Sequence, residues 1–339
     1  MTLLVKNFYS DEMQSDSGQK NLEIICAGII VSDIFLPPLS RLPHEGELLK
    51  MGEPIHQVGG CAANTAIALS RLGKKTGIIG MVGNDSMGKN LIDSLINEHI
   101  NTNAIFKSQN SSTSQTIIIP VQNQDRRYIH YFGANADFNV ANLESGINNY
   151  LFTNDSKIFI LGGYLLMPKI ESKELAQLLK NLKKQNYTII LDIAISSDET
   201  KLVEKVQDVL PYVDYFFPND DEAEVLTGIE NPQEQSKCFL DWGVNAAAIT
   251  CGTNGVIYRD SKEFFRIEPY EIDFVDGSGA GDAFTAGMAI GISESWPLTE
   301  SLKFGAVLGA SVCQGLGCNT TLFSRSKAQV EMQKLKVIN

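Results

Sequence analysis

The sequence of 339 residues is poor in the features that mark secreted, zinc-binding and membrane-spanning proteins. Its six cysteines, at positions 26, 61, 238, 251, 313 and 318, form no Cys-x-x-Cys pair, and the four histidines complete no zinc pattern. We therefore expect ordinary thiols in a reducing, cytoplasmic setting. Since no apolar run is long enough to span a bilayer, we expect no membrane partner.

Positive charge is also scarce. Lys and Arg total 28 against 40 Asp and Glu, which gives a formal net charge of −12. Binding to nucleic acid requires clustered cations that neutralise phosphates, so we expect no nucleic-acid partner. This balance does not exclude a nucleotide, because a few backbone N–H groups are enough to bind one phosphate group.

Residues 1–20 lack the charged start, apolar stretch and cleavage site of a signal peptide. Their Ser, Asp, Gln and Lys content predicts a flexible N-terminal tail without a catalytic role. The remainder, residues 21–330, is long enough and apolar enough to form one domain with a sizeable core.

Short apolar runs alternate with segments of helical periodicity along this domain. The predicted strands cover residues 24–31, 76–82, 157–161, 188–192, 212–217, 246–251 and 256–258. The predicted helices cover residues 62–72, 86–98, 171–184, 200–210, 280–292 and 298–312. The alternation predicts an α/β fold with a mainly parallel sheet covered on both faces. Ligands of such sheets bind beyond the carboxyl ends of the strands, so we expect the site there.

One region interrupts the alternation. Residues 114–121 and 127–132 are two β-type runs joined by the polar stretch 122–126, which predicts a hairpin. Together with residues 34–57, a segment of about 113–133 would form a small separate sheet, a lid over a binding cleft. The alternative is a hairpin at the edge of the main sheet.

The most informative stretch is DGSGAGD at residues 276–282, which follows a strand-like run at 272–275 and opens a predicted helix. Its alternate glycines permit unusual backbone angles, and successive N–H groups at a helix start can converge on one anion. Asp282 would lie beside that anion and could take a proton from an attacking hydroxyl. The alternative is a Gly-rich helix start in which Asp282 only complements the helix dipole.

A second motif, GGCAANTAIALSRLG, occupies residues 59–73. Gly59 and Gly60 precede a predicted helix and permit a ligand to approach the backbone closely. The amide of Asn64 can both donate and accept hydrogen bonds, as recognition of a polyol requires. On its own, this motif could equally be a capping and packing device.

Taken together, the two motifs resemble the two signature regions of the ribokinase/PfkB carbohydrate kinases, in the same order and with similar separation. The stretch 218–228 (PNDDEAEVLTG) resembles the N-x-x-E motif of that family. The resemblance covers about residues 22–325 and implies a three-layer α/β/α domain, ribokinase-like, with a small β lid.

The resemblance also implies roles for individual residues. Asp282 would be the general base, and the N–H groups of Gly279, Ala280 and Gly281 would stabilise the transferring phosphoryl group. The residues implied to bind the sugar are Asp33, Gly59, Gly60 and Asn64. The residues implied to bind the nucleotide are Asn219, Thr250 and Gly252, with Glu222 holding Mg²⁺ through water.

Three of these assignments have simpler alternatives. Asp33 could be an N-cap in a loop, Glu222 could be a first-turn acid of a helix, and the segment 250–252 could be a plain strand end. Asp276 and Ser278 match the positions of a K⁺ site near the phosphate turn, with residues 313–318 as its second half.

The chain departs from the family pattern at three positions. Gly277 stands where the family usually has Thr, Val31 where ribokinases have Asn, and Cys61 where they have Lys. The last two changes weaken the case for ribose as the substrate.

Two further features compete with this interpretation. GNDSMGKN at residues 83–90 nearly matches a Walker A loop, but Asn90 replaces the Ser or Thr hydroxyl that binds Mg²⁺. Arg126 and Arg127 in the lid could reach a phosphate on the substrate or be solvated hairpin charges.

We therefore predict ATP-dependent, Mg²⁺-assisted phosphorylation of a hydroxyl on a sugar or sugar-like polyol. A nucleoside kinase on the same scaffold remains an alternative, as does a catalytically silent ligand-binding regulator. A homodimer formed through the exposed lid edge is a further expectation that the family resemblance implies.

Overall fold

The computed structural model describes residues 21–122, 124, 126–152, 157–196 and 201–338, so the predicted tail at 1–20 lies outside the described residues. Ten strands form the main sheet in the order β16-β15-β14-β13-β12-β11-β10-β2-β5-β6. Their bounds are β2 (Ile24–Gly28), β5 (Thr76–Gly83), β6 (Asn101–Ser108), β10 (Lys157–Gly162), β11 (Tyr187–Leu191), β12 (Tyr215–Phe216), β13 (Ala246–Thr250), β14 (Val256–Asp260), β15 (Phe264–Ile267) and β16 (Val337–Ile338). The strands from β6 to β13 are parallel, and β14, β15 and β16 add an antiparallel edge.

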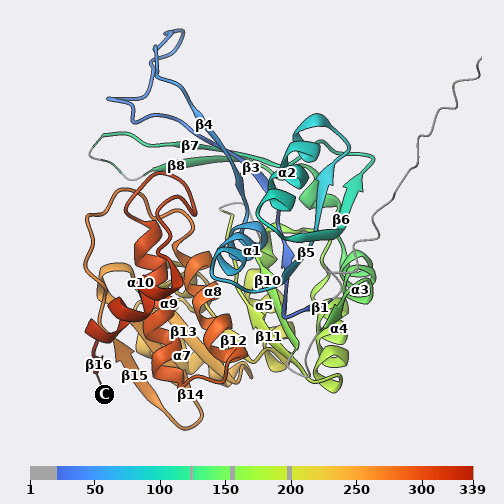
Figure 1. Ribbon diagram of the computed structural model, residues 1–339, viewed down its shortest axis with the longest axis vertical. Helices are drawn as coiled ribbons and strands as arrows, with labels where there is room; N and C mark the ends of the chain where they lie inside the picture. Colours follow the sequence, from blue (N-terminus) through green and yellow to red (C-terminus); the bar gives the residue numbers. More distant parts are fainter. Residues whose placement is uncertain (1–20, 123, 125, 153–156, 197–200, 339) are drawn as a thin grey trace, which may run out of the picture.

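Helices cover both faces of this sheet (Figure 1). Their bounds are α1 (Cys61–Arg71), α2 (Ser86–Asn97), α3 (Val140–Asn148), α4 (Ser172–Lys184), α5 (Leu202–Val209), α6 (Asp220–Thr227), α7 (Pro232–Asp241), α8 (Ala280–Ser293), α9 (Leu298–Val312) and α10 (Arg325–Glu331). Ile25 and Ala27 of β2 face a core shared with α3 to α7, whereas Ile24 and Cys26 face a core shared with α1, α2, α8, α9 and α10. This alternation along one strand confirms the predicted three-layer α/β/α architecture.

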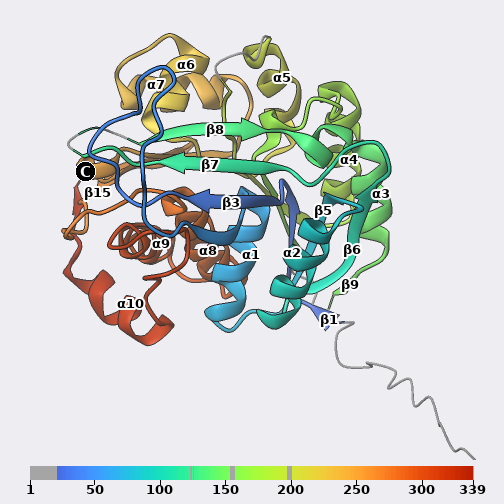
Figure 2. The same cartoon turned by 90° about the horizontal axis from the view of Figure 1, so that it is seen from above.

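A second sheet of four strands, in the order β4-β3-β7-β8, makes the lid. Its strands are β3 (Val31–Phe35), β4 (Ile55–Gly59), β7 (Gln115–Ile119) and β8 (Arg127–Tyr131). Figure 1 shows them beyond one end of the main sheet, and Figure 2 shows β3, β7 and β8 side by side from above. The predicted hairpin is thus confirmed, and the alternative of an edge hairpin of the main sheet is wrong.

Three predicted strands differ from the structure. The run 212–217 is reduced to β12, because Tyr212 ends a 3-10 helix. The run 24–31 divides at Gly28, which has a φ of 134° and no room for a side chain against Gly162. The chain therefore leaves the main sheet after β2, and Val31 starts β3 of the lid. The run 272–275 is an irregular loop rather than a strand, and Phe274 and Val275 are exposed.

Several other segments were not predicted as elements. They are β6, β15, α3, α7, α10 and the two-residue strands β1 (Asn21–Leu22), β9 (Leu151–Phe152) and β16. β6 and α7 are rich in polar residues, and their sequences give no continuous apolar run.

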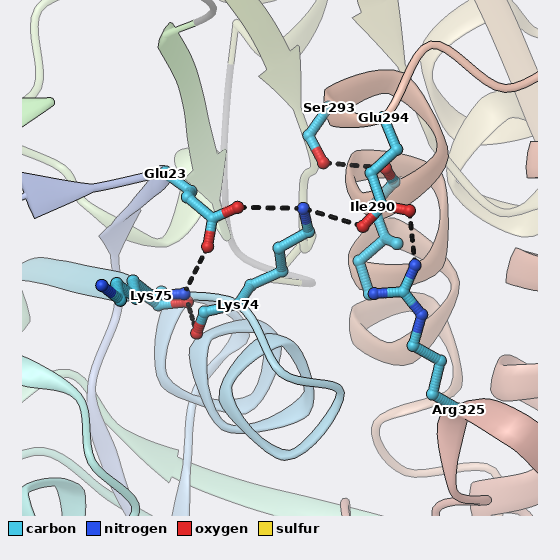
Figure 3. Close-up of polar contacts among 8 residues, drawn as sticks. Glu23, Lys74, Lys75, Ile290, Ser293, Glu294 and Arg325 are labelled. Carbon is cyan, nitrogen blue, oxygen red and sulfur yellow. Dashed lines mark hydrogen bonds and ion pairs between the residues drawn. The ribbon is translucent and has the colours of Figure 1, made fainter. Parts of the chain in front are cut away.

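The buried ammonium group of Lys74 connects the start of β2 with the end of α8 (Figure 3). Lys74, between α1 and β5, has a side chain only 6% exposed and pairs with Glu23 at 3.0 Å and Glu294 at 2.9 Å. Glu294 caps the C-terminus of α8 and also pairs with Arg325 of α10. The network therefore fixes the end of α8 that lies away from the Gly-rich turn.

None of the helices in the described part of the chain is both long enough and apolar enough to cross a bilayer.

Candidate active site

The two sequence motifs meet at the start of α8. Gly279 caps the helix in the left-handed conformation, with a φ of 81°, and a side chain there would meet the carbonyl oxygen of Cys318 at 2.5 Å. Asp282 is the third residue of α8 and is 8% exposed. Asn64 of α1 donates a hydrogen bond from Nδ2 to Asp282 Oδ2 over 2.8 Å. Helices α1 and α8 thus position a carboxylate beside the Gly-rich turn.

The N–H groups predicted to form an anion cradle, those of residues 279–281, lie at the start of α8. The first N–H groups of any helix lack acceptors within the helix, which applies to Ala280 and Gly281. Ala280 N–H also lies 3.3 Å from the carbonyl oxygen of Gly277, which closes the turn. The helix dipole adds positive potential at the same end.

The residues predicted to bind the sugar surround this carboxylate. Asp33 lies within β3 and is 7% exposed, so its alternative role as an N-cap in a loop is wrong. A side chain at Gly59 would overlap the carboxylate of Asp33, and one at Gly60 would meet the carbonyl oxygen of Ile29 at 2.5 Å. The two glycines therefore let β4 and the start of α1 close around Asp33.

Burial makes this region unfavourable for negative charge. It raises the pKa of Asp282 to about 6, although hydrogen bonds from Asn64 and Cys61 lower it. The pKa of Asp33 rises to about 7, chiefly through burial, while the Thr116 hydroxyl lowers it and Asp282 raises it. The negative charge of Asp282 also raises the pKa of Glu222 in α6, so Asp33 and Glu222 both lie within reach of this carboxylate.

Asp192 is a member of this site that the sequence motifs did not identify. It directly follows β11 and is 7% exposed. Burial, Asp282 and Glu222 raise its pKa well above the ordinary range. Its position at the carboxyl end of a buried parallel strand was the available signal, because ligands bind at those ends.

The predicted nucleotide residues lie together at the ends of β12 and β13. Asn219 forms a β-bridge with Thr250, whose N–H also bonds to the carbonyl oxygen of Pro218 at 3.1 Å. Gly252 follows in a 3-10 turn. The fold thus brings the predicted nucleotide residues together at the carboxyl ends of two neighbouring strands.

Glu222 belongs to the first turn of α6 and forms a capping box with Asn219. Its N–H donates to Asn219 Oδ1 over 2.8 Å, and its Oε2 accepts from Asn219 N–H over 3.0 Å. Glu222 is therefore a first-turn acid, as the simpler alternative expected, and it also forms a capping box. Burial, Asp221 and Asp282 nevertheless raise the pKa of Glu222 to about 7, although the bond from Asn219 lowers it.

Arg126, which directly precedes β8 of the lid, contacts the Gly-rich turn at residues 276–282. Its Nε lies 3.1 Å from Asp276 Oδ1, and Asp276 is 4% exposed. The same oxygen accepts from the N–H and the hydroxyl of Ser278, and Asp276 N–H bonds to the carbonyl oxygen of Cys313 at 3.2 Å. Asp276, Ser278 and Cys313 are therefore adjacent as predicted, and Arg126 is not the solvated charge of the alternative interpretation.

Arg127 differs from its neighbour, because its side chain is exposed and donates to Gln124.

The loop that resembles a Walker A motif has a structural role in the described chain. Its Asp85 caps α2 through Gly88 N–H and accepts from the N–H and hydroxyl of Thr113 at the base of the lid.

Comparisons with known proteins agree with this geometry. A family model described as pfkB family carbohydrate kinase matches residues 21–324. A 5-dehydro-2-deoxygluconokinase of Clostridium botulinum is 26% identical over 317 residues, covering 88% of this chain and 89% of the relative. A ribokinase of Haemophilus influenzae is 27% identical over 281 residues, covering 79% and 85% of the two chains.

Solved structures share the fold. A ribokinase of Thermotoga maritima superposes with a TM-score of 0.74 at 24% identity, covering 92% of this chain and all of the other. A candidate ribokinase II of E. coli, solved in complex with ATP and Mg²⁺, gives a TM-score of 0.75 at 20% identity and covers 92% and 99%. The fold and the lid are therefore those of the ribokinase-like group.

Proposed function

Since this chain belongs to the pfkB family of carbohydrate kinases, we propose that Asp282 is the general base of a phosphoryl transfer from ATP to a sugar hydroxyl. The observation that carries the assignment is the contact between Asn64 and Asp282, because it joins the two motifs around one carboxylate. A base works best when its pKa is close to the working pH, and burial brings that of Asp282 to about 6.

In this proposal, charge on the transferring group is stabilised by the turn. The N–H groups of Gly279, Ala280 and Gly281 would face the phosphoryl oxygens at the positive end of α8. At positions 279 and 281 no side chain would separate the backbone from the phosphate, because both residues are glycines. The protein would thus act by positioning and charge stabilisation, without a covalent intermediate.

Acceptor hydroxyls would be held by Asp33, Asn64 and the backbone at Gly59 and Gly60. The amide oxygen Oδ1 of Asn64 is buried and has no hydrogen-bond partner among the described residues. A sugar hydroxyl would supply the missing donor, while Asp33 could accept from a second hydroxyl. Both polar groups thus point to a ligand that carries several hydroxyls.

ATP and Mg²⁺ would lie on the other side of Asp282. Asn219, Thr250 and Gly252 would contact the nucleotide, and Glu222 would hold Mg²⁺ through water. The donor set fits a hard cation, because Glu222 is a buried carboxylate and the charge of Asp282 raises its pKa. When bound, the metal would neutralise charge on the nucleotide phosphates.

Asp276 and Ser278 would form part of a K⁺ site. Oδ2 of Asp276 is buried and lacks a hydrogen-bond partner in the described part of the chain, so it could bind a monovalent cation. Arg126 occupies the opposite oxygen, Oδ1. The lid arginine and a bound cation would therefore share the charge of one carboxylate.

Two edges of the lid sheet are open to a second copy of the chain. β4 and β8 are its outer strands, and the side chains of Ile55, Tyr128, Ile129 and Tyr131 are exposed on them. Pairing of one such edge would form a homodimer through the lid. Light scattering would report it, and an Ile129→Lys variant would then elute as a monomer.

The decisive experiment is release of ADP from Mg-ATP over a panel of sugars, sugar acids, sugar phosphates and nucleosides. Release that depends on a sugar and is lost in Asp282→Asn would support the proposal. Release with nucleosides alone would favour the nucleoside-kinase alternative. Binding of ATP without release for any acceptor would favour a silent regulator.

A further inference from the structure

Three potential metal ligands converge beside the phosphate turn. They are the thiol of Cys61 and the carboxylates of Asp192 and Asp282, and one ligand atom from each lies within 4.8 Å of the others. They come from separate parts of the chain: the first residue of α1, the residue after β11 and the first turn of α8. The fold, rather than local sequence, therefore brings them together.

The thiol lies between the two carboxylates. A hydrogen bond from Cys61 lowers the pKa of Asp192 and also that of Asp282. Because a thiol has one proton, it can serve only one carboxylate at a time. Both aspartates are more than nine-tenths buried, whereas Cys61 is partly exposed.

The surroundings of the cluster are acidic. The neighbouring charges that raise the pKa of Asp192 belong to Asp282 and Glu222, and those that act on Cys61 belong to Asp282, Asp192, Glu222 and Cys318. Buried carboxylates that lie this close need a proton or a cation to offset their repulsion. A divalent cation would supply that charge.

An independent observation lies next to Asp282. Asn64, which is 3% exposed, uses Nδ2 for Asp282, while its Oδ1 has no partner in the described residues. An amide oxygen without a donor is a suitable neutral ligand for a cation or for a water bound to it. The unsatisfied atom therefore points to a ligand in this part of the site, for which the metal would compete with the sugar hydroxyl of the proposed function.

We propose that Cys61, Asp192 and Asp282 form an inhibitory site for a thiophilic divalent cation such as Zn²⁺. Zn²⁺ binds Cys at about 2.3 Å and carboxylates at about 2.0–2.2 Å in tetrahedral geometry, which places ligand atoms about 3.3–3.8 Å apart. A small closure of the cluster would give these separations. Mg²⁺ prefers oxygen ligands alone, so the thiol selects against it.

Binding would displace the proton of Cys61, because the thiolate is the form that binds metal. It would also occupy the carboxylate of Asp282, which could then no longer accept a proton from the acceptor hydroxyl. The inhibitory consequence rests on the proposed function, whereas binding of the metal itself does not.

Metal binding is tested first, on the full-length protein without nucleotide. Titration with Co²⁺ should produce a thiolate-to-cobalt charge-transfer absorption that Zn²⁺ abolishes by competition. Cys61→Ser should lose this absorption and weaken binding at least about tenfold, the lower end of what even outer-shell changes cost. Cys238→Ser is the matched control, because Cys238 is also partly exposed but lies on α7, away from the cluster.

Absence of the absorption in the wild-type protein, or its persistence in Cys61→Ser, would overturn the site. Asp192→Asn provides a second variant if Cys61→Ser fails to fold, and it should weaken Co²⁺ binding by a similar factor.

Inhibition is tested second, by ADP release with Mg²⁺ in large excess over Zn²⁺. The wild-type protein and Cys238→Ser should lose activity with Zn²⁺ and regain it with a zinc-selective chelator, and Cys61→Ser should need at least about ten times more Zn²⁺. Equal inhibition of all three proteins would show that Zn²⁺ acts elsewhere. Tight Co²⁺ binding in a protein that phosphorylates no acceptor would refute the proposed function and leave the metal site intact.

Discussion

The amide of Asn64 donates a hydrogen bond to the carboxylate of Asp282 over 2.8 Å, although the two residues are 218 positions apart in the chain. Asn64 is the fourth residue of α1, and Asp282 lies in the first turn of α8. This bond orients the carboxylate and favours its ionised form. Both effects suit a group that must accept a proton.

Asp282→Asn should lower kcat by about 10²–10⁴-fold, the usual contribution of a general base, and leave thermal stability nearly unchanged. The amide keeps the shape of the carboxylate but cannot take up the proton. Initial rates of ADP release measure the effect. Asp93→Asn is the control, because Asp93 is a half-exposed acid on α2 that pairs only with Lys89 in the described contacts. Near-normal turnover of Asp282→Asn would remove the assigned role.

The pH profile of kcat/KM should fall on the acid side with a midpoint near the pKa of Asp282, about 6. The sign follows because the base works only when ionised, so activity is lost as the pH drops below that pKa. Asn64 lowers this pKa, so Asn64→Ala should move the acid limb to higher pH in addition to raising KM. An acid limb near pH 4, the ordinary range of Asp, would contradict the assignment.

Gly279→Ala should destabilise the protein and impair ATP turnover. Its φ of 81° costs a residue with a side chain about 1–2 kcal/mol, and the added Cβ would meet the Cys318 carbonyl oxygen at 2.5 Å. Gly281→Ala is the matched control for folding, because a Cβ there has open space and the free energy of unfolding should change by less than about 0.5 kcal/mol. Equal melting temperatures for the two variants would count against the strained turn.

Lys74→Met should lower the free energy of unfolding by about 1.5–3 kcal/mol, the range for hydrogen bonds to charged groups. The variant leaves Glu23 and Glu294 without their shared cation, and each side chain is only 26% exposed. Lys89→Met removes a lysine that is 71% exposed and should cost less than about 0.5 kcal/mol. Urea denaturation distinguishes the two, and a similar loss in both variants would argue against the network.

Arg126→Ala should increase the stimulation of turnover by K⁺. Without the guanidinium, Asp276 keeps a buried charge that a monovalent cation can offset. Rates in K⁺ and in tetramethylammonium buffers measure the difference. Arg127→Ala is the control and should behave like the wild-type protein, because the Arg127 side chain is exposed. An unchanged K⁺ response in Arg126→Ala would show that the lid arginine does not influence the cation site.

The sequence predicted those parts of the fold that are governed by local patterns. Long apolar runs such as β5 and strongly periodic helices such as α4 matched the structure within one or two residues. The break after Gly28 was missed because the apolar run continues to Val31, and the reason for the break is a contact with Gly162 on another strand. The run 272–275 was wrongly predicted as a strand for a different reason, since Phe274 and Val275 are exposed and only Ile272 packs against the core.

The site was predicted in outline because its motifs are contiguous. Asp192 carries no motif of its own, and only the parallel pairing of β10, β11 and β12 places it beside Asp282. The ion pair of Arg126 with Asp276 depends on how the lid is oriented over the turn. Neither relationship is encoded in residues that are neighbours in the chain.

The close approach of Asp33 and Gly59 has an evolutionary consequence. The carboxylate at position 33 occupies the space where any side chain at position 59 would begin, so position 59 can gain a side chain only if residue 33 becomes smaller. Among relatives of this protein, a side chain at position 59 should therefore be accompanied by a smaller residue at position 33. The two positions would be inherited as a pair, and their joint variation should mark branches of the lineage that have changed their acceptor.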